Sequence, residues 1–424
     1  MHHAQKVWCY RRDVLHKDEL NRFFEAQQKL VVLAGADGVT QAALTGAIEE
    51  LDAVLREVGG TLYPVKNIPE WIELLIVAAI IACGVRSFFL QPFKIPTNSM
   101  YPTYHGMTAE VFSVDDDATG PGAAARAWRK LTLWTGRVEV RTPTGGEVLI
   151  PLDGNNTLPR PTDGTDGGVF GTGWLRGATD VYYVLVGDET RVPIPVPKEF
   201  SLTGVILKTY FPEEAALPVH ESERWRNALQ HAADRGDLRE LANGQRVMRT
   251  RKTVAAGQRV VNFDVLTGDM VLVDRMSYHF VRPKAGDPFV FATKNITGLN
   301  DRSGKPQDLY YIKRLVGQPG DTLRVAAPVL LRNAEPISGK PAFDKNNTRQ
   351  VALEYYGYLP AAGGYSAQPL HEARTIPAGH YFAMGDNSGN SYDSRGWGFV
   401  PEKEVIGRGF FILYPFTSRW GFAE

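Results

Sequence analysis

The chain has 424 residues, enough for two or three domains, and its 43% hydrophobic content is ordinary for a folded protein. Its 47 basic residues balance its 47 acidic residues, so no net charge favours nucleic acid or another polyanion as a partner. The two cysteines, Cys9 and Cys83, are too few for a disulfide framework and argue against a cysteine-based zinc site.

The first part of the chain has a helical pattern. Between Glu19 and Val58, hydrophobic residues recur three and four positions apart on both sides of a break at Gly35–Gly38. This predicts a helical hairpin that ends at Gly59 and Gly60, within a helical region over residues 1–68. Either a small packing unit or a partner-binding helix pair fits such a pattern.

Residues 69–90 are much more apolar. Leu74–Val85 is an unbroken run of apolar or small residues, with Glu73 and Arg86 near its two ends. About 20 apolar residues suffice to cross a bilayer, so we expect a single transmembrane anchor, and a buried core helix is the alternative. Some 70 residues precede the run, so we do not expect a cleavable signal peptide. Basic residues flank both sides, and charge therefore does not set the orientation.

Beyond the anchor, hydrophobic residues alternate with a period of two, which is typical of strands. With 27 prolines and 42 glycines in the chain, this predicts a mostly β soluble part with one helix near residues 221–233. The segments predicted as strands include Arg137–Arg141, Val181–Val186, Val205–Tyr210, Met270–Val273 and Phe289–Phe291. The run Asp115–Asp117 indicates a solvated turn and not a metal site, because calcium needs many spaced oxygen ligands.

A proline-framed turn surrounds Ser99. Pro96 and Pro102 exclude a helix there, and Asn98 is one of the few non-glycine residue types that tolerate positive φ. Such a turn can expose a hydroxyl group and direct backbone N–H groups at one point, as an oxyanion hole requires. An ordinary turn is the alternative.

A lysine lies in a later alternating segment, Tyr310–Asp321. Alternation puts Tyr311, Lys313 and Leu315 on one strand face. Burial penalises an ammonium group and lowers the pKa of a lysine, which a lysine general base needs. A strand-edge lysine that extends to water is the alternative.

The third segment, Met384–Pro401, is rich in Gly, Asn, Asp and Ser and is therefore predicted to be a loop. In it, Asp393 and Arg395 can form an orienting ion pair. Ser388, in Gly385–Gly389, superficially resembles a chymotrypsin-like nucleophile. Asn387 displaces that serine and no histidine has the matching context. No serine has a lysine three positions later, so a β-lactamase-like site is also excluded.

In this order, the three segments resemble the motifs of bacterial type I signal peptidases. The family has a Pro-Ser-x-Ser-Met-x-Pro-Thr box, and here Thr97 and Asn98 replace the commoner Ser and Gly. A Gly-Asp strand pair follows, matched by Gly268–Val273 and Lys284–Phe291, and then the lysine and polar-loop motifs. Some 160 residues, His105–Thr267, intervene where the family continues almost at once.

The resemblance implies a role for each matching residue. Ser99 resembles the nucleophile and Lys313 its general base, while the Ser99 N–H and the Thr97 hydroxyl resemble the oxyanion hole. Ser391 matches the residue that positions the lysine, and Tyr311 lies beside the dyad. Asp393 and Arg395 match the supporting pair.

The resemblance also implies a fold and an activity. We expect a mostly β catalytic domain formed by residues 91–104 and 268–424, interrupted by a β-rich insertion at 105–267. The activity is a membrane-bound serine endopeptidase that removes signal peptides of Ala-x-Ala type from exported preproteins through an acyl-enzyme. No metal or organic cofactor is required. The partners are preproteins and the lipid bilayer, and the sequence predicts no oligomeric state.

The expected location is the inner, or cytoplasmic, membrane with a single pass. The catalytic domain faces the periplasm or exterior, and residues 1–68 face the cytoplasm. The alternative is an inactive membrane-anchored scaffold or assembly factor on the same fold.

Overall fold

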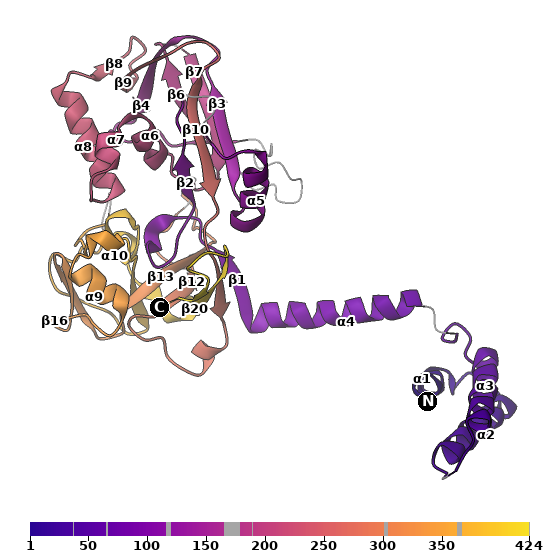
Figure 1. Cartoon of the computed structure of the whole chain (residues 1–424). Coiled ribbons are helices and arrows are strands. Elements are labelled where there is room, and N and C mark those ends of the chain that lie inside the picture. The colour runs from indigo at the N-terminus through magenta and orange to yellow at the C-terminus, as the bar shows by residue number, and fades with distance from the viewer. Residues whose placement is uncertain are drawn as a thin grey trace. The chain divides into compact units, whose positions relative to one another are not determined.

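The computed structural model describes residues 1–36, 38–64, 67–115, 120–164, 179–188, 190–300, 304–362 and 367–423 (Figure 1). Backbone contacts divide the chain into two compact units, Met1–Val85 and Arg86–Glu424. Each unit is described separately below.

The first unit contains the predicted helical hairpin. Helices α2 (Lys17–Ala34) and α3 (Gln41–Val58) bury a shared core that includes Phe23 and Leu51. Helix α1 (His2–Arg11) was not predicted. It buries only Ala4 and Val7, too few apolar positions to give a helical pattern in the sequence.

Helix α4 (Asn67–Phe88) carries the predicted anchor. Its segment Trp71–Phe88 has a mean hydropathy of 1.9, and none of that segment is buried by the rest of the protein. Among the described residues it is the one helix long and apolar enough to cross a membrane. The alternative of a buried core helix therefore finds no support in the packing.

The second unit is built on an eight-stranded sheet that contains both halves of the predicted catalytic domain. In spatial order its strands are β1 (Leu90–Lys94), β11 (Met270–Asp274), β20 (Val405–Tyr414), β12 (Pro288–Ala292), β13 (Tyr310–Gly317), β18 (His380–Met384) and β19 (Val400–Pro401), with β21 (Gly421–Phe422) against β20. β1 starts two residues after α4 and pairs antiparallel with β11, so the residues on either side of the insertion are adjacent.

A smaller four-stranded sheet follows β13 in the sequence. Its strands are β16 (Glu335–Pro336), β15 (Val329–Arg332), β14 (Thr322–Ala326) and β17 (Arg374–Thr375). Helix α9 (Pro341–Asn347) lies in the same region and buries Phe343 in a core with Leu323 and Leu330. Helix α10 (Ser394–Trp397) and the 3₁₀ turn η4 (Ser388–Asn390) lie in the polar loop predicted from the sequence.

The segment 105–267 forms two further antiparallel sheets (Figure 1). They share a large apolar core, and a smaller cluster around Leu149 and Val247 lies apart from it. The first contains β2 (Thr108–Val111), β10 (Arg259–Leu266) and β3 (Gly136–Arg141). The second contains β5 (Thr162–Asp163), β6 (Thr179–Val186), β4 (Gly146–Leu152), β9 (Arg246–Val254) and β8 (Leu238–Glu240), with β7 (Thr190–Pro197) against β6. The two ends of the segment meet, since the His105 N–H donates to Asp269 Oδ2 and the Asp269 N–H donates to His105 O, both at 2.8 Å.

The helices of this segment were only partly predicted. Helix α8 (Glu221–Asp234) confirms the predicted helix. The predicted strand Val205–Tyr210 is wrong, because these residues form helix α6 (Thr203–Tyr210). A short apolar run fits a buried strand or a buried helix equally well. Helices α5 (Ala123–Leu133) and α7 (Pro212–Ala215) were not predicted.

The acidic run falls partly outside the described residues. Asp115 pairs with Lys252 at 2.7 Å, while Asp116 and Asp117 lie beyond the described part. Within the described ranges, no cluster of three His, Cys, Asp or Glu side chains could hold a metal ion.

Candidate active site

The turn that carries Ser99 is fixed by hydrogen bonds to neighbouring segments. Ser99 lies in the 3₁₀ turn η1 (Asn98–Met100), shortly after β1. The Asn98 side chain accepts from the Gly106 N–H at 2.9 Å and donates to Met107 O at 3.2 Å. Asn98 is not among the positive-φ residues of the described chain, so it stabilises the turn through its amide group and not through unusual backbone geometry.

Gly106 permits this close packing of the two segments. A Cβ atom at Gly106 would lie 2.2 Å from the carbonyl carbon of Thr97, too close for any side chain without movement of the backbone. Gly106 and Met107 therefore pack directly against the segment Pro96–Thr103, which is called the nucleophile box below.

Lys313 lies in the centre of the main sheet. In β13 it is opposite Phe289 of β12, and only 4% of it is exposed. Its Nζ donates to Ser99 Oγ over 2.5 Å. Burial lowers the pKa of Lys313 to about 8, while the nearby Asp393 carboxylate opposes this effect. The structure thus brings together the two residues predicted to form the dyad, which lie 214 positions apart.

Thr97 lies beside the nucleophile. Its hydroxyl donates to Ser99 Oγ over 3.4 Å. Thr97, Ser99, Lys313 and Tyr311 all line one cavity of about 730 Å³. The Thr97 hydroxyl therefore lies close to the Ser99 hydroxyl, and its role in an oxyanion hole stays a prediction.

Asp393 and Arg395 form the predicted ion pair in a fully buried position. Both side chains are 0% exposed, and Arg395 donates to the two Asp393 oxygens at 2.9 and 2.7 Å. Arg395 also donates to Leu359 O at 2.7 Å. Burial alone would raise the pKa of Asp393, but Arg395 and Lys313 outweigh burial, and the pKa is lowered. Asp393 is therefore a buried negative charge near the lysine.

Ser391 and Tyr311 line the same cavity as the dyad. Ser391 is buried, and its Oγ has no hydrogen-bond partner among the described residues. The bond from Ser391 to the lysine is therefore not formed in this structure, and that role stays a prediction. Tyr311 directs its hydroxyl to Gln307 Oε1 at 2.9 Å.

A second buried ion pair was missed. Arg314, next to Lys313, donates to Asp386 at 2.7 and 2.6 Å, and both side chains are at most 1% exposed. Thr103 donates to Asp386 Oδ2 at 2.5 Å and thereby links the nucleophile box to the polar loop. The sequence could have indicated this pair, because Thr103, Arg314 and Asp386 all lie in the three segments that resemble signal peptidase motifs. Alternation, however, puts Arg314 on the face opposite Lys313, where a solvent-exposed arginine is the usual expectation.

Ser388, the alternative candidate for the nucleophile, has a structural role. It is fully buried, and its Oγ accepts from the Leu359 N–H and from Arg395 Nη1, both at 2.9 Å. A hydroxyl oxygen with both acceptor positions occupied is not available as a nucleophile.

The insertion reaches the catalytic cavity, which the sequence did not indicate. Glu199 and Ser222 line that cavity together with the dyad. Near them His220 packs against Tyr356 with ring centroids 4.5 Å apart and the rings tilted by 51°, and Arg224 donates to Tyr356 Oη at 3.3 Å. The His220 ring also lies against Gly389 of the polar loop, where a Cβ atom would come within 2.5 Å of it. These contacts hold the insertion against the polar loop and the segment that contains Tyr356.

Comparisons with known proteins agree with the motif analysis. The family model described as signal peptidase, peptidase S26, matches residues 68–119 and 252–414, just over half of the chain. A probable signal peptidase I-1 from Synechocystis is 33% identical over 155 residues, which cover 36% of this chain and 66% of that protein. Signal peptidase I from Leptolyngbya laminosa is 31% identical over 154 residues, which cover 36% of this chain and 63% of that protein.

A solved signal peptidase I from Enterococcus faecalis aligns with 30% of this chain and 97% of its own, at 24% identity and a TM-score of 0.21. The two curated relatives are matched over somewhat less than two thirds of their length. Residues 120–251, which the family model leaves unmatched, lie inside the insertion. The extent of the family match shows that this chain belongs to the signal peptidase family, peptidase S26.

Proposed function

We propose that this protein is a membrane-bound serine endopeptidase that cleaves signal peptides from exported preproteins. The observation that carries the proposal is the 2.5 Å contact between Lys313 Nζ and Ser99 Oγ in a buried position next to Thr97. A lysine whose pKa is lowered to about 8 is neutral in about one molecule in ten at pH 7, far more often than an ordinary lysine, and this neutral form can accept a proton from serine.

The reaction proceeds in two stages. Ser99 Oγ attacks the scissile carbonyl carbon as Lys313 takes the hydroxyl proton, and the Thr97 hydroxyl and the Ser99 N–H stabilise the oxyanion. Lys313 then gives this proton to the leaving amine, and an acyl-enzyme remains. In the second stage Lys313 removes a proton from water, which attacks the ester, and Ser99 regains its proton.

The other predicted residues support the dyad. Asp393 and Arg395 fix the polar loop around Lys313, and the unpartnered Ser391 hydroxyl lines the same cavity. We expect the Ser391 hydroxyl to bond the lysine when substrate binds. Tyr311 forms part of the cavity wall next to the dyad.

The anchor and the family support a proposal for the substrate and the location. The Trp71–Phe88 helix spans the inner membrane once, with residues 1–68 in the cytoplasm and the catalytic domain outside. Ser99 lies nine residues after Leu90, which is a reach of about 30 Å at most for an extended chain. The site therefore stays near the bilayer surface, where a signal peptide presents its small-residue Ala-x-Ala cleavage site. Protease accessibility of both sides in intact cells tests this orientation.

The decisive test uses the full-length protein in detergent with a model preprotein and mass-spectrometric mapping of the cut. Ser99→Ala and Lys313→Ala should each lower kcat/KM by about 10³-fold or more. Lys294→Ala, which removes an exposed lysine paired with Asp308, is the matched control and should cleave normally.

Retained cleavage by either dyad variant would rule out the mechanism. The alternative function, an inactive scaffold on the same fold, would be supported if the unaltered protein cleaved no preprotein.

A further inference from the structure

The insertion forms part of the wall of the catalytic cavity. Glu199, between β7 and α6, and Ser222, at the start of α8, line the cavity that contains Ser99 and Lys313. Among the residues described as lining this cavity, Glu199 is the one acidic side chain. A substrate bound at the dyad would therefore meet a carboxylate contributed by the insertion.

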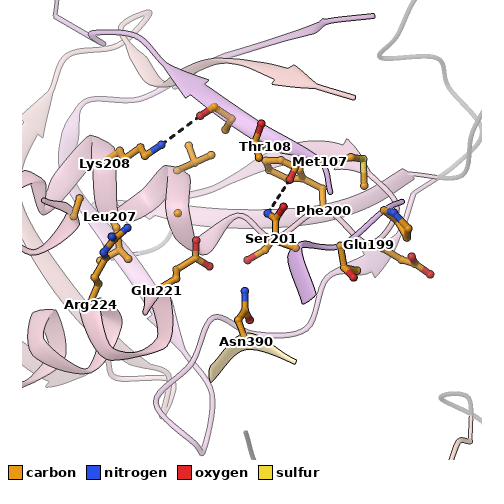
Figure 2. A pocket seen from close by; sticks show the side chains of 17 residues that line it. Met107, Thr108, Glu199, Phe200, Ser201, Leu207, Lys208, Glu221, Arg224 and Asn390 are labelled. Atoms are coloured by element: carbon orange, nitrogen blue, oxygen red, sulfur yellow. Dashed lines mark hydrogen bonds between the residues drawn. The ribbon is translucent and has the colours of Figure 1, made fainter. Parts of the chain in front are cut away.

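The groove continues from the dyad into the insertion. A second cavity of about 160 Å³ lies on the insertion side and shares Pro96, Thr97, Glu199 and Asn390 with the catalytic cavity. Figure 2 shows this second cavity, with Glu199 at one side and Asn390 from the polar loop below. Glu199 thus lies at the junction of the two cavities, next to the residues that precede the nucleophile.

The backbone holds Glu199 in an uncommon conformation. Its φ is +67°, in the left-handed region that non-glycine residues rarely adopt. The Glu199 N–H donates to the buried Asp180 at 3.0 Å, and the next residue, Phe200, is buried and stacked on Phe263 with centroids 6.0 Å apart. Contacts on both sides therefore fix the position of Glu199, and strained positions of this kind concentrate at functional sites.

The Glu199 carboxylate has no hydrogen bond or ion pair with another residue of the described chain. The neighbouring cations of the second cavity are already engaged, since Lys208 donates to Ala109 O at 3.5 Å and Arg224 donates to Leu217 O at 2.8 Å. Their charges act on Glu221, the other acid of that cavity.

The cations of the catalytic cavity do not pair with Glu199 either. Lys313 is hydrogen-bonded to Ser99. Lys94, on β1, also lines the cavity but forms no ion pair with Glu199 among the described residues. Partial burial raises the pKa of Glu199, while the charge of the neighbouring Lys198, which itself pairs with Asp163 at 4.0 Å, opposes this effect only in part. A further cation beside the carboxylate would therefore favour its charged form.

We propose that Glu199 is a specificity residue by which the insertion selects preproteins with a lysine or arginine close to the scissile bond. This inference rests on the proposed peptidase function. A cationic side chain in the groove satisfies the carboxylate, whereas an acidic side chain at the same substrate position is repelled.

The test uses full-length protein in detergent and a set of peptides with one signal-peptide cleavage sequence. One residue at a time, from three before to three after the cut bond, is Lys, Gln or Glu. The measured quantity is the ratio of kcat/KM for the Lys peptide to that for the Glu peptide. At one position at least, the ratio should exceed one and fall by about threefold to tenfold in Glu199→Gln. Glu199→Asp, which keeps the charge, should retain part of the preference.

Glu240→Gln is the matched control. Glu240 is an exposed acid of β8 in the same insertion and lines neither cavity, so its ratios should equal those of the unaltered protein. Equal thermal unfolding midpoints of the Glu199 variants and the unaltered protein show that the turn still folds.

Two outcomes separate this inference from the proposed function. If the unaltered protein cleaves the Gln peptides but Glu199→Gln changes the ratio at no position, the role of Glu199 is disproved and the peptidase function stands. If no peptide is cleaved, or if Ser99→Ala cleaves equally well, the proposed function itself fails.

Discussion

The catalytic part and the insertion are both β structures, but they handle charge in opposite ways. The catalytic part buries complete ion pairs, Arg395 with Asp393 and Arg314 with Asp386, together with Lys313. The insertion has a large apolar core, and its ion pairs leave one partner partly exposed, as in Arg249 with Glu147, where the arginine side chain is 41% exposed. Burial of a charge changes its chemistry, and only the catalytic part needs that change.

The largest expected effect comes from breaking a buried pair. Arg395→Met should lower the free energy of unfolding by about 3–5 kcal/mol, because Asp393 would remain as a buried charge without its partner. Urea unfolding of the full-length protein in detergent measures the change. A decrease of less than about 1 kcal/mol in the free energy of unfolding would mean that water solvates Asp393 in the variant and that the ion pair does not order the loop.

Removal of Lys313, the proposed general base, should raise the free energy of unfolding instead of lowering it. The folded-state pKa of Lys313 is lowered from 10.5 to about 8, so near pH 7 the folded protein carries a desolvated ammonium group. Lys313→Met should therefore stabilise the protein by about 3 kcal/mol near neutral pH while it abolishes cleavage. The unfolded state binds more protons between the two pKa values, so the gain should shrink as the pH rises from about 8 towards 10.5. A destabilised variant would show that the ammonium group is well solvated.

The dependence of kcat/KM on pH tests the effect of burial on Lys313 directly. If the neutral form of Lys313 is the base, as proposed, kcat/KM should reach a plateau above about pH 8 and fall about tenfold for each pH unit below it. Initial rates with the model preprotein measure this profile. Full activity well below pH 5 would exclude a neutral-lysine base.

The smallest expected effect concerns the insertion. Arg249→Met should change the free energy of unfolding by less than about 1 kcal/mol, because a partly exposed pair is screened by solvent. The same urea experiment applies. A loss as large as that in Arg395→Met would remove the distinction between the two regions.

Much of the site could be predicted because its residues lie in short motifs that restrict the backbone. Pro96 and Pro102 identified the turn, and alternation in Tyr310–Asp321 put Lys313 on an inner face. The pairing of Asp393 with Arg395 could be predicted because they lie two residues apart. Arg314 was missed because alternation assigns it to the outer face, and only the covering polar loop makes that face an interior one.

The insertion was the least predictable part. Its strands and the helix α8 could be recognised, but the run Val205–Tyr210 was assigned to the wrong element. Its buried face is set by packing against the nearby helices α7 and α8 and against β2 and β10, which lie far from it in the sequence.

The sequence alone therefore identified the parts of the proposed site: the serine, the lysine, the polar loop and the apolar segment before them. These depend on residue type and local spacing, which backbone sterics and periodicity make readable. Only the tertiary structure showed that Ser99 and Lys313, which lie 214 positions apart, are 2.5 Å from each other. It also showed that the insertion contributes Glu199 to the same cavity. Such contacts depend on how whole sheets pack, and no local pattern encodes that.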